Sequence, residues 1–234
     1  MSGRFFFAMK KYSILIPIHN EVDHVPRLLD TIGNYIVDGH QIIIVDDGSN
    51  DGSTIILSNF KKIDLVCLRK NKGKGYAIRE GLKIAIYNKI IIYDGDMELR
   101  SSEISKLMIL DKDKNINFVM GYRFKSLSPL KSDFDWGNFM FTSFFNIVFK
   151  SNHKDILCCA KAFYASELIN YKIISDGFAI DVELASLLTI FNKRRKIPQI
   201  LLNYNRRTID EGKKLKISDG WSILSRIIKM TKYL

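Results

Sequence analysis

The sequence predicts an α/β fold with a Rossmann-like, mostly parallel sheet flanked by helices. Three observations lead to this prediction. Short β-branched runs alternate with segments of helical period, which is the pattern of βαβ units. The predicted strands are almost continuously apolar, as in parallel sheets covered on both faces. Polar residues follow each of the first four strands, at the sheet edge where ligands of such folds bind.

The first hundred residues carry the regular part of this pattern. Their strands are runs of Ile, Val and Leu, and their helices repeat apolar residues every three or four positions. Strands are predicted at 12–18, 41–45, 64–68 and 90–93, and helices at 26–33, 54–60 and 76–87. Beyond residue 100 the alternation loosens, which predicts a mixed half. The elements expected there are helices at 102–110, 136–149 and 181–191, strands at 117–122 and 196–202, a basic loop at 206–216 and an amphipathic helix from Trp221.

Composition indicates an ordered, globular protein. The chain has 234 residues, 47% of them hydrophobic and 26% charged, which is enough for one domain to bury a core. Its three cysteines lack Cys-x-x-Cys spacing and indicate neither a disulfide framework nor a zinc site. No apolar run approaches the roughly 18 residues of a membrane span, and residues 5–9 are too short for a signal-peptide core. We therefore expect a cytoplasmic protein.

The net charge of +11 predicts a polyanionic partner. Nucleic acid, an anionic membrane surface and a phosphorylated substrate all fit this charge. The choice among them depends on the motifs.

An acidic pair after the fourth predicted strand is the main chemical signal. Asp94 and Asp96, separated by Gly95, directly follow the apolar run 90–93. Mg²⁺ and Mn²⁺ favour carboxylate oxygens and can bridge them to a diphosphate, stabilising the charge on a leaving group. Glu98 could add a third oxygen. Taken alone, the pair also fits an acidic turn that caps a helix or faces solvent.

Two further segments at the same predicted edge suit a nucleotide. Segment 46–49, Asp-Asp-Gly-Ser, can accept hydrogen bonds from a base or ribose, and a turn with a helix N-cap is the alternative. Segment 71–75, Asn-Lys-Gly-Lys-Gly, combines amides, glycines and positive charge at a helix start, which suits a phosphate. It lacks the third glycine of a dinucleotide fingerprint, and a glycine-rich turn explains it equally well.

Basic residues near the end of the chain predict phosphate contacts. Arg206, Arg207, Lys213 and Lys214 place four cations within nine residues, enough to clamp a phosphate. Arg123, directly after the predicted fifth strand, is a further candidate. Solvated surface charge is the alternative for all five.

Taken together, these segments resemble the family-2 glycosyltransferases, in the branch of dolichol-phosphate mannosyltransferase and its polyprenyl-phosphate relatives. The resemblance covers most of the chain. The segments that carry it are 13–21 (SILIPIHNE), 45–53 (VDDGSNDGS), 71–75 (NKGKG), 94–96 (DGD) and 211–214 (EGKK).

The resemblance implies a GT-A fold in one domain, residues 1–234, with a nucleotide-binding half at 1–100 and an acceptor-binding half at 101–234. It implies a GDP- or UDP-linked sugar donor and Mg²⁺ or Mn²⁺ as cofactor. The residues it places around the nucleotide are Pro17, His19, Glu21, Val45 and Asp47. Those it places at the metal and diphosphate are Asp94, Gly95, Asp96 and Glu98. Those facing donor and acceptor phosphates are Arg123, Arg207 and Lys213, and Lys74 joins them from the glycine-rich segment.

The chain departs from the family at three places. His19 stands where relatives usually carry tyrosine, and Glu98 where they often carry glutamine. Asp135 and Trp136 stand ahead of a helix start where the family often has an arginine, which leaves the acceptor open.

The family resemblance implies an inverting displacement at the anomeric carbon of the sugar. A polyprenyl or dolichyl phosphate acceptor, with a second pKa of about 6, is ionised at pH 7 and needs no base. A saccharide or other hydroxyl acceptor needs one, and the candidates are Asp155, Asp181 and Glu183. Complementing a helix dipole is the alternative role of Asp181 and Glu183. We assign Asp181, with Asp94 and Asp96, to the catalytic site.

Two segments suit an anionic membrane surface. One is the Phe-rich stretch 139–149, and the other is the terminal helix, where Trp221 and Ile228 stand against Arg226 and Lys229. Burial in the core is the alternative. The sequence thus predicts a protein peripheral to the inner face of a membrane.

Two other functions fit parts of the sequence. A magnesium-dependent phosphohydrolase of the haloacid dehalogenase type also uses Asp-x-Asp after a strand, but that motif belongs on the first strand, and Met97 replaces its Thr or Val. A basic nucleic-acid-binding module fits the charge, but zinc-finger spacing and RNA-binding aromatic motifs are absent, and the paired carboxylates repel phosphate unless a metal intervenes. We expect no nucleic-acid partner.

Overall fold

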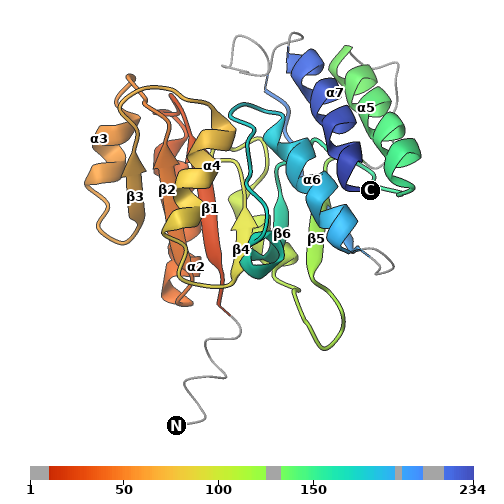
Figure 1. Ribbon diagram of the computed structural model, residues 1–234. Helices are drawn as coiled ribbons and strands as arrows, with labels where there is room; N and C mark the ends of the chain where they lie inside the picture. Colours follow the sequence, from red (N-terminus) through yellow and green to blue (C-terminus); the bar gives the residue numbers. More distant parts are fainter. Residues whose placement is uncertain (1–10, 125–132, 193–196, 208–218) are drawn as a thin grey trace.

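A mixed sheet runs through the centre of the protein (Figure 1). The computed structural model describes residues 11–124, 133–192, 197–207 and 219–234, and within these ranges seven strands lie in the order β3-β2-β1-β4-β6-β5-β7. β1 is parallel to β2 and β4, β2 to β3, and β5 to β7, whereas β6 is antiparallel to β4 and β5. The strand bounds are β1 Ser13–Ile18, β2 Gln41–Asp46, β3 Asp64–Cys67, β4 Lys89–Ile92, β5 Phe118–Tyr122, β6 Lys161–Tyr164 and β7 Gln199–Leu201.

Both faces of the sheet are covered. Every residue of β1 and β2 is buried, and successive strand residues point to opposite faces. Ile14 and Ile16 pack in the core that contains α2 (Val25–Val37), whereas Leu15 packs in the core that contains α4 (Lys74–Lys83). Continuous apolar runs therefore suit strands placed between two helical layers.

α6 (Ile180–Phe191) lies deep in the protein, with ten of its twelve residues buried. It packs against α5 (Asp133–Phe149) and α7 (Asp219–Met230), which lie outside it (Figure 1). The remaining bounds are α3 Ser53–Ser58 and the 3₁₀ helices η1 Ser101–Leu107, η2 Ala165–Leu168 and η3 Thr231–Tyr233.

The strand order reverses at β1, which lies between β2 and β4. At such a switch point the connections leave in opposite directions and open a crevice beyond the carboxyl ends of the strands. The segments after β1, β2 and β4 therefore meet at one edge.

The predicted α/β fold is confirmed, including its parallel first half and mixed second half. Three predicted helices differ. The helix expected at 26–33 continues to Val37 as α2. The helix expected at 102–110 is the 3₁₀ helix η1, and the helix expected to reach residue 87 ends at Lys83. There the amides of Ile86 and Tyr87 donate to the side chains of Gln41 and Ser13, which turns the chain away from the helix.

β6 is absent from the predicted elements. Its first residue, Lys161, interrupts the apolar run at 156–164, so the segment does not show the continuous apolar pattern of a central strand. Most of the basic loop expected at 206–216 lies outside the described residues.

Candidate functional site

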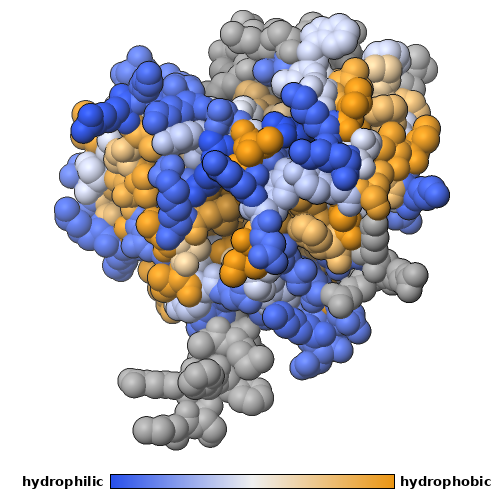
Figure 2. All heavy atoms as spheres, viewed as in Figure 1, coloured by the Kyte–Doolittle hydropathy of each residue, from blue (hydrophilic) through white to orange (hydrophobic). Residues whose placement is uncertain are grey.

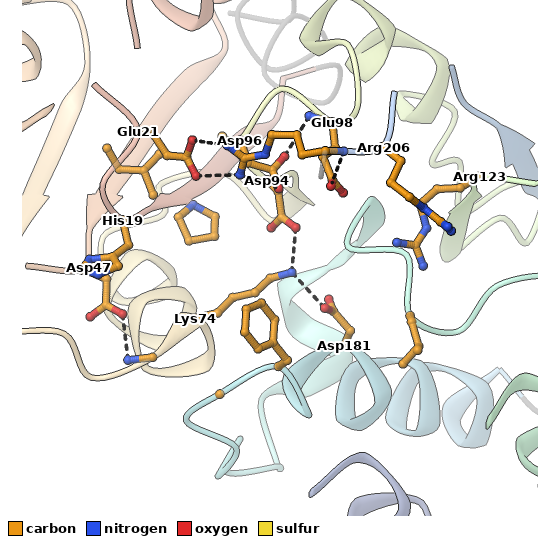
Figure 3. Close-up of a pocket in the computed structure, with 18 of the residues that line it drawn as sticks. His19, Glu21, Asp47, Lys74, Asp94, Asp96, Glu98, Arg123, Asp181 and Arg206 are labelled. Atoms are coloured by element: carbon orange, nitrogen blue, oxygen red, sulfur yellow. Dashed lines mark hydrogen bonds and ion pairs between the residues drawn. The ribbon is translucent and has the colours of Figure 1, made fainter. Parts of the chain in front are cut away.

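A cavity of about 340 Å³ lies at the carboxyl edge of the sheet, beside the switch point. Small-molecule sites typically measure about 300 to 1,000 Å³. Its walls come from the segments after β1, β2, β4, β5 and β7 and from the starts of α4 and α6 (Figure 3). Its polar and charged lining residues include His19, Glu21, Asp47, Lys74, Asp94, Asp96, Glu98, Arg123, Asp181, Arg206 and Arg207.

The acidic pair after β4 stands in this cavity. A side chain at Gly95 would overlap Ile18, so only glycine lets this segment approach β1 so closely. Asp94 Oδ1 is buried and has no hydrogen-bond partner among the described residues, and Asp96 Oδ1 accepts the amide of Glu98 at 3.0 Å. Burial raises the pKa of Asp94, and the charge of Asp96 adds to the rise although Lys74 opposes it. Burial and then the charge of Glu98 raise the pKa of Asp96.

Lys74 links the acidic pair after β4 to the start of α6. Its Nζ lies 2.9 Å from Asp94 Oδ2 and 2.9 Å from Asp181 Oδ2, at the start of α6 (Figure 3). Burial opposes the charge on Lys74, but Asp181 and Asp94 outweigh it and hold its pKa well above the usual value. Burial likewise opposes ionisation of Asp181, but Lys74 and Lys161 outweigh it and lower its pKa.

Arg207 connects the segment after β7 to the acids. Its guanidinium binds both carboxylate oxygens of Glu21, and Nη2 lies 3.6 Å from Asp96 Oδ2. Its backbone amide donates to Glu98 Oε1 at 3.0 Å. One arginine thus contacts Glu21 and, about 75 positions later in the sequence, Asp96 and Glu98.

A basic and aromatic cluster forms another wall. Arg123 Nε and Nη2 donate to Asp155 Oδ2 and Oδ1 at 2.8 and 2.9 Å, and this carboxylate is buried. The guanidiniums of Arg123 and Arg206 both lie over the rings of Phe124 and Tyr204, at 5.3 to 5.9 Å from their centroids. Two cations are thereby fixed at the cavity wall opposite α4.

The glycine-rich segment 71–75 serves largely as a packing turn. The amides of Lys72 and Gly73 donate to the two oxygens of Asp47, each at 2.7 Å. The amide of Gly75 donates to the carbonyl of Asp176 at 2.6 Å, and a side chain at Gly75 would overlap the backbone there. These amides therefore already have partners within the protein. Asn71, Gly73 and Lys74 of this segment line the cavity, and Lys74 contributes its charge there.

The structure does not bring every predicted residue to the cavity. Pro17 and Gly95 line it, but Val45 is wholly buried in the sheet core. Lys213 lies outside the described residues. Glu98 lines the cavity, yet within the described residues no three His, Cys, Asp or Glu side chains are grouped to hold a metal. Glu98 Oε1 instead accepts the backbone amide of Arg207.

Sequence reasoning missed the aromatic part of the lining, which comprises Phe124, Phe178 and Tyr204. Two signals could have found it. Phe178 precedes Asp181 by three positions, close to one helical turn, and Tyr204 follows a strand at the same edge as the acids.

Residues 13–169 match the family model of glycosyl transferase family 2. The chain belongs to this family. The match spans the segments after β1, β2 and β4, which carry most of the acidic cavity residues.

Relatives of this family-2 chain come from archaea and bacteria. The uncharacterized protein MJ0544 of Methanocaldococcus jannaschii is 30% identical over 198 residues, 78% of this chain and 83% of that protein. Glycosyltransferase AglJ of Haloferax volcanii is 27% identical over 74% of this chain and 56% of its own length. Undecaprenyl-phosphate 4-deoxy-4-formamido-L-arabinose transferase of Yersinia pestis is 33% identical over 43% of this chain. The chain covers only a third of that last enzyme.

A solved structure shares the fold. Glucosyl-3-phosphoglycerate synthase from Mycobacterium tuberculosis, crystallised with Mn²⁺, UDP and glucosyl-3-phosphoglycerate, superimposes with a TM-score of 0.74. The identity is 14%, and the alignment covers 97% of this chain and 83% of the synthase. This family-2 chain therefore has a GT-A fold.

Asp94 and Asp96 fit a divalent cation as two ligands. Asp94 has a buried oxygen with no hydrogen-bond partner among the described residues, and burial raises the pKa of both acids, so the two carboxylate charges are poorly solvated. A cation would relieve this charge, with its remaining oxygens supplied by a bound ligand.

Proposed function

We propose that this family-2 glycosyltransferase moves a hexose, with inversion, from a nucleoside diphosphate sugar to a polyprenyl or dolichyl phosphate. One observation carries the proposal: two carboxylates and several fixed cations line the same cavity. Asp94 and Asp96 suit a metal-bound diphosphate. On another wall, the guanidiniums of Arg206 and Arg123 suit a second anionic substrate, with the charge of Arg123 already matched by Asp155.

The donor nucleotide is assigned to the edge formed by β1 and β2. Pro17, His19 and Asp47 line this part of the cavity. Each oxygen of Asp47 accepts one backbone amide and keeps a lone pair for a base or ribose hydroxyl. The UDP bound by the Mycobacterium synthase supports a UDP-linked donor, and a GDP-linked donor is the alternative.

Mg²⁺ or Mn²⁺ would be held by Asp94 and Asp96. Such an ion, when bound, stabilises the charge that grows on the departing diphosphate. Lys74 supplies a positive charge beside Asp94, and the Glu21–Arg207 pair fixes the surroundings of Asp96. Mn²⁺ in the synthase crystals supports this cofactor class.

None of the three candidate carboxylates is well suited to act as a base, and this favours a phosphate acceptor. Asp155 is bound on both oxygens by a guanidinium, and Glu183 is wholly buried and accepts backbone amides of the preceding loop. Asp181 lines the cavity, but its lowered pKa makes it a weak base near pH 7. A phosphate that is already ionised needs no base. A hydroxyl acceptor is the second candidate, supported by the oxygen that Asp181 presents beside Lys74.

A lipid acceptor requires contact with a bilayer, and α5 offers a suitable face. Trp136, Met140, Phe144 and Ile147 follow helical spacing and are exposed, and Figure 2 shows apolar residues gathered over this side of the protein. Trp221 and Ile228 of α7 are exposed as well, and Lys150, Lys154 and Lys229 add positive charge nearby in the chain. We propose that this face rests on an anionic membrane.

Within the described residues, no helix has both the length and the apolar character of a membrane span.

The test of the proposed function is a donor panel. UDP-glucose, UDP-galactose and GDP-mannose are each incubated with the protein, Mn²⁺ or Mg²⁺, and undecaprenyl phosphate, and the lipid is analysed by mass spectrometry. We expect one donor to yield a glycosylated lipid phosphate, and EDTA to abolish the product. Free undecaprenol is the matched acceptor without the phosphate, and its glycosylation would favour the hydroxyl acceptor. If the donor is consumed but neither undecaprenyl phosphate nor undecaprenol is glycosylated, the lipid assignment is contradicted.

A further inference from the structure

Lys161 is a buried lysine for which the proposed chemistry gives no role. It lies on β6, paired with Ile92 of β4 and Met120 of β5, and its side chain is wholly buried. Its Nζ donates to the carbonyl of Cys158 and lies 3.6 Å from Asp181 Oδ1. A charge buried this deeply is costly unless it is paired, so Asp181 is its natural partner.

Asp181 is held from two sides. From the cavity side, Lys74 lies 2.9 Å from Oδ2, and it is shared with Asp94. From the core side, Lys161 faces Oδ1, which is buried and accepts no hydrogen bond from any residue that the structure describes. Lys161 stands on a central strand and its side chain is wholly buried, whereas Lys74 lines the cavity and its side chain is 11% exposed. The two lysines therefore differ in their freedom to move.

We propose that Lys161 is a positioning residue that holds the Asp181 carboxylate charged and keeps Oδ2 aimed into the cavity when Lys74 turns toward a bound diphosphate. The idea rests on the proposed function, which brings that diphosphate to Asp94. Asp181 Oδ2 then accepts a hydrogen bond from a hydroxyl of the transferred sugar. The other charges around Asp181 are Arg123 after β5 and Asp94 after β4.

The surroundings of Lys161 argue against a purely structural reason for the charge. Ile92, Met120 and Phe163 share its side of the sheet and belong to the apolar core. Replacing a buried ion pair by apolar residues is often neutral or stabilising, so packing alone does not require a lysine here. A lysine is required here only if the Asp181 carboxylate has to stay charged.

The first experiment is a double-mutant cycle on thermal stability, which needs no substrate. Lys161→Met leaves Asp181 without its core-side cation and should lower Tm by about 5 °C or more. In an Asp181→Asn background the same change should leave Tm unchanged or raise it, because the lysine there has lost its anion. Equal effects in the two backgrounds would overturn the pairing.

The second experiment separates positioning from stability. At a temperature where every variant is folded, Lys161→Met should lower kcat at least tenfold with little change in donor KM, and Lys161→Arg should recover part of the loss. In the Asp181→Asn background Lys161→Met should have no further effect on kcat. An unchanged kcat in Lys161→Met, or a further loss in that background, would refute the proposal.

Lys89→Met is the matched control. Lys89 lies on β4, and its Nζ donates to the carbonyl of Leu110 rather than facing Asp181. It should neither couple to Asp181→Asn in stability nor change kcat. If wild-type protein transfers no sugar to any acceptor, the proposed function has failed, while the stability cycle still decides whether Lys161 supports Asp181.

Discussion

Arg207 and Glu21 form a two-pronged ion pair, with Nη1 2.8 Å from Oε2 and Nη2 3.0 Å from Oε1. The partners are 186 positions apart and follow β7 and β1. Because the same guanidinium lies 3.6 Å from Asp96 Oδ2, the pair fixes one edge of the carboxylate site.

Arg207→Lys should therefore impair sugar transfer. Lysine keeps the charge but loses the planar fork that engages both oxygens of Glu21. We expect kcat/KM to fall by about tenfold to a hundredfold, as for loss of one or two charge-assisted hydrogen bonds. Steady-state kinetics with the donor from the panel measures this. Arg69→Lys, at an exposed site, is the control, and equal rates for both variants would remove Arg207 from the site.

Asp155→Asn should destabilise the fold strongly. The wholly buried carboxylate of Asp155 neutralises Arg123 through two short bonds. Breaking such a pair leaves an unmatched charge and costs about 3 kcal/mol, or about 6 to 12 °C in Tm. Glu80→Gln, which breaks the exposed pair with Lys83, should shift Tm by less than about 2 °C. Similar small shifts for both variants would show that the buried pair adds little stability.

His153 should make the protein less stable in mild acid. Burial, and then the charge of Lys161, lowers the pKa of His153 to about 4. The unfolded state takes up a proton near pH 6.5, whereas the folded state does so only near pH 4, so stability falls as pH drops between these values. The loss from this group should reach about 3 kcal/mol at pH 4.

Denaturant unfolding of wild type and His153→Gln between pH 7.5 and 4 measures this effect. The variant should lose less stability over that range than wild type. His24→Gln, at a partly exposed site, should follow the wild-type curve. Parallel curves for wild type and His153→Gln would mean that His153 has the same pKa in the folded and unfolded states, which would contradict this prediction.

The exposed face of α5 should control membrane binding. Met140→Glu with Ile147→Glu places two charges on that face and should reduce binding to vesicles of phosphatidylglycerol and phosphatidylcholine at least tenfold. Vesicle sedimentation measures the partition. Ile55→Glu with Ile86→Glu adds equal charge at exposed apolar sites elsewhere and should have a much smaller effect. An equal loss in both variants would indicate general charge repulsion instead of a docking face.

The acids of the cavity could be predicted because parallel strands have a fixed direction. Asp47 and Asp94 follow different strands of the parallel half, so their meeting at one edge follows from strand polarity alone. Contacts across the fold could not be predicted in this way. The orientation of Glu98 depends on an amide 109 positions away, that of Arg207.

The burial of Lys161 is a similar case. From sequence alone, a lysine in a short segment is expected at the surface. The antiparallel insertion of β6 between β4 and β5 is what buries Lys161 beside Asp181. The alternatives left open for segment 71–75 depended on the loop at 175–177, whose backbone lies against its glycines. In both cases distant packing, rather than local pattern, determines the role.

The central claim is that Asp94 and Asp96 bind a metal together with the donor diphosphate. Anomalous diffraction at the manganese edge, from crystals grown with Mn²⁺ and UDP, tests it most directly. We predict a peak within about 2.3 Å of an oxygen from each carboxylate and of a phosphate oxygen, and its loss in Asp96→Asn. UDP bound in the cavity with no peak beside these two residues would contradict the claim.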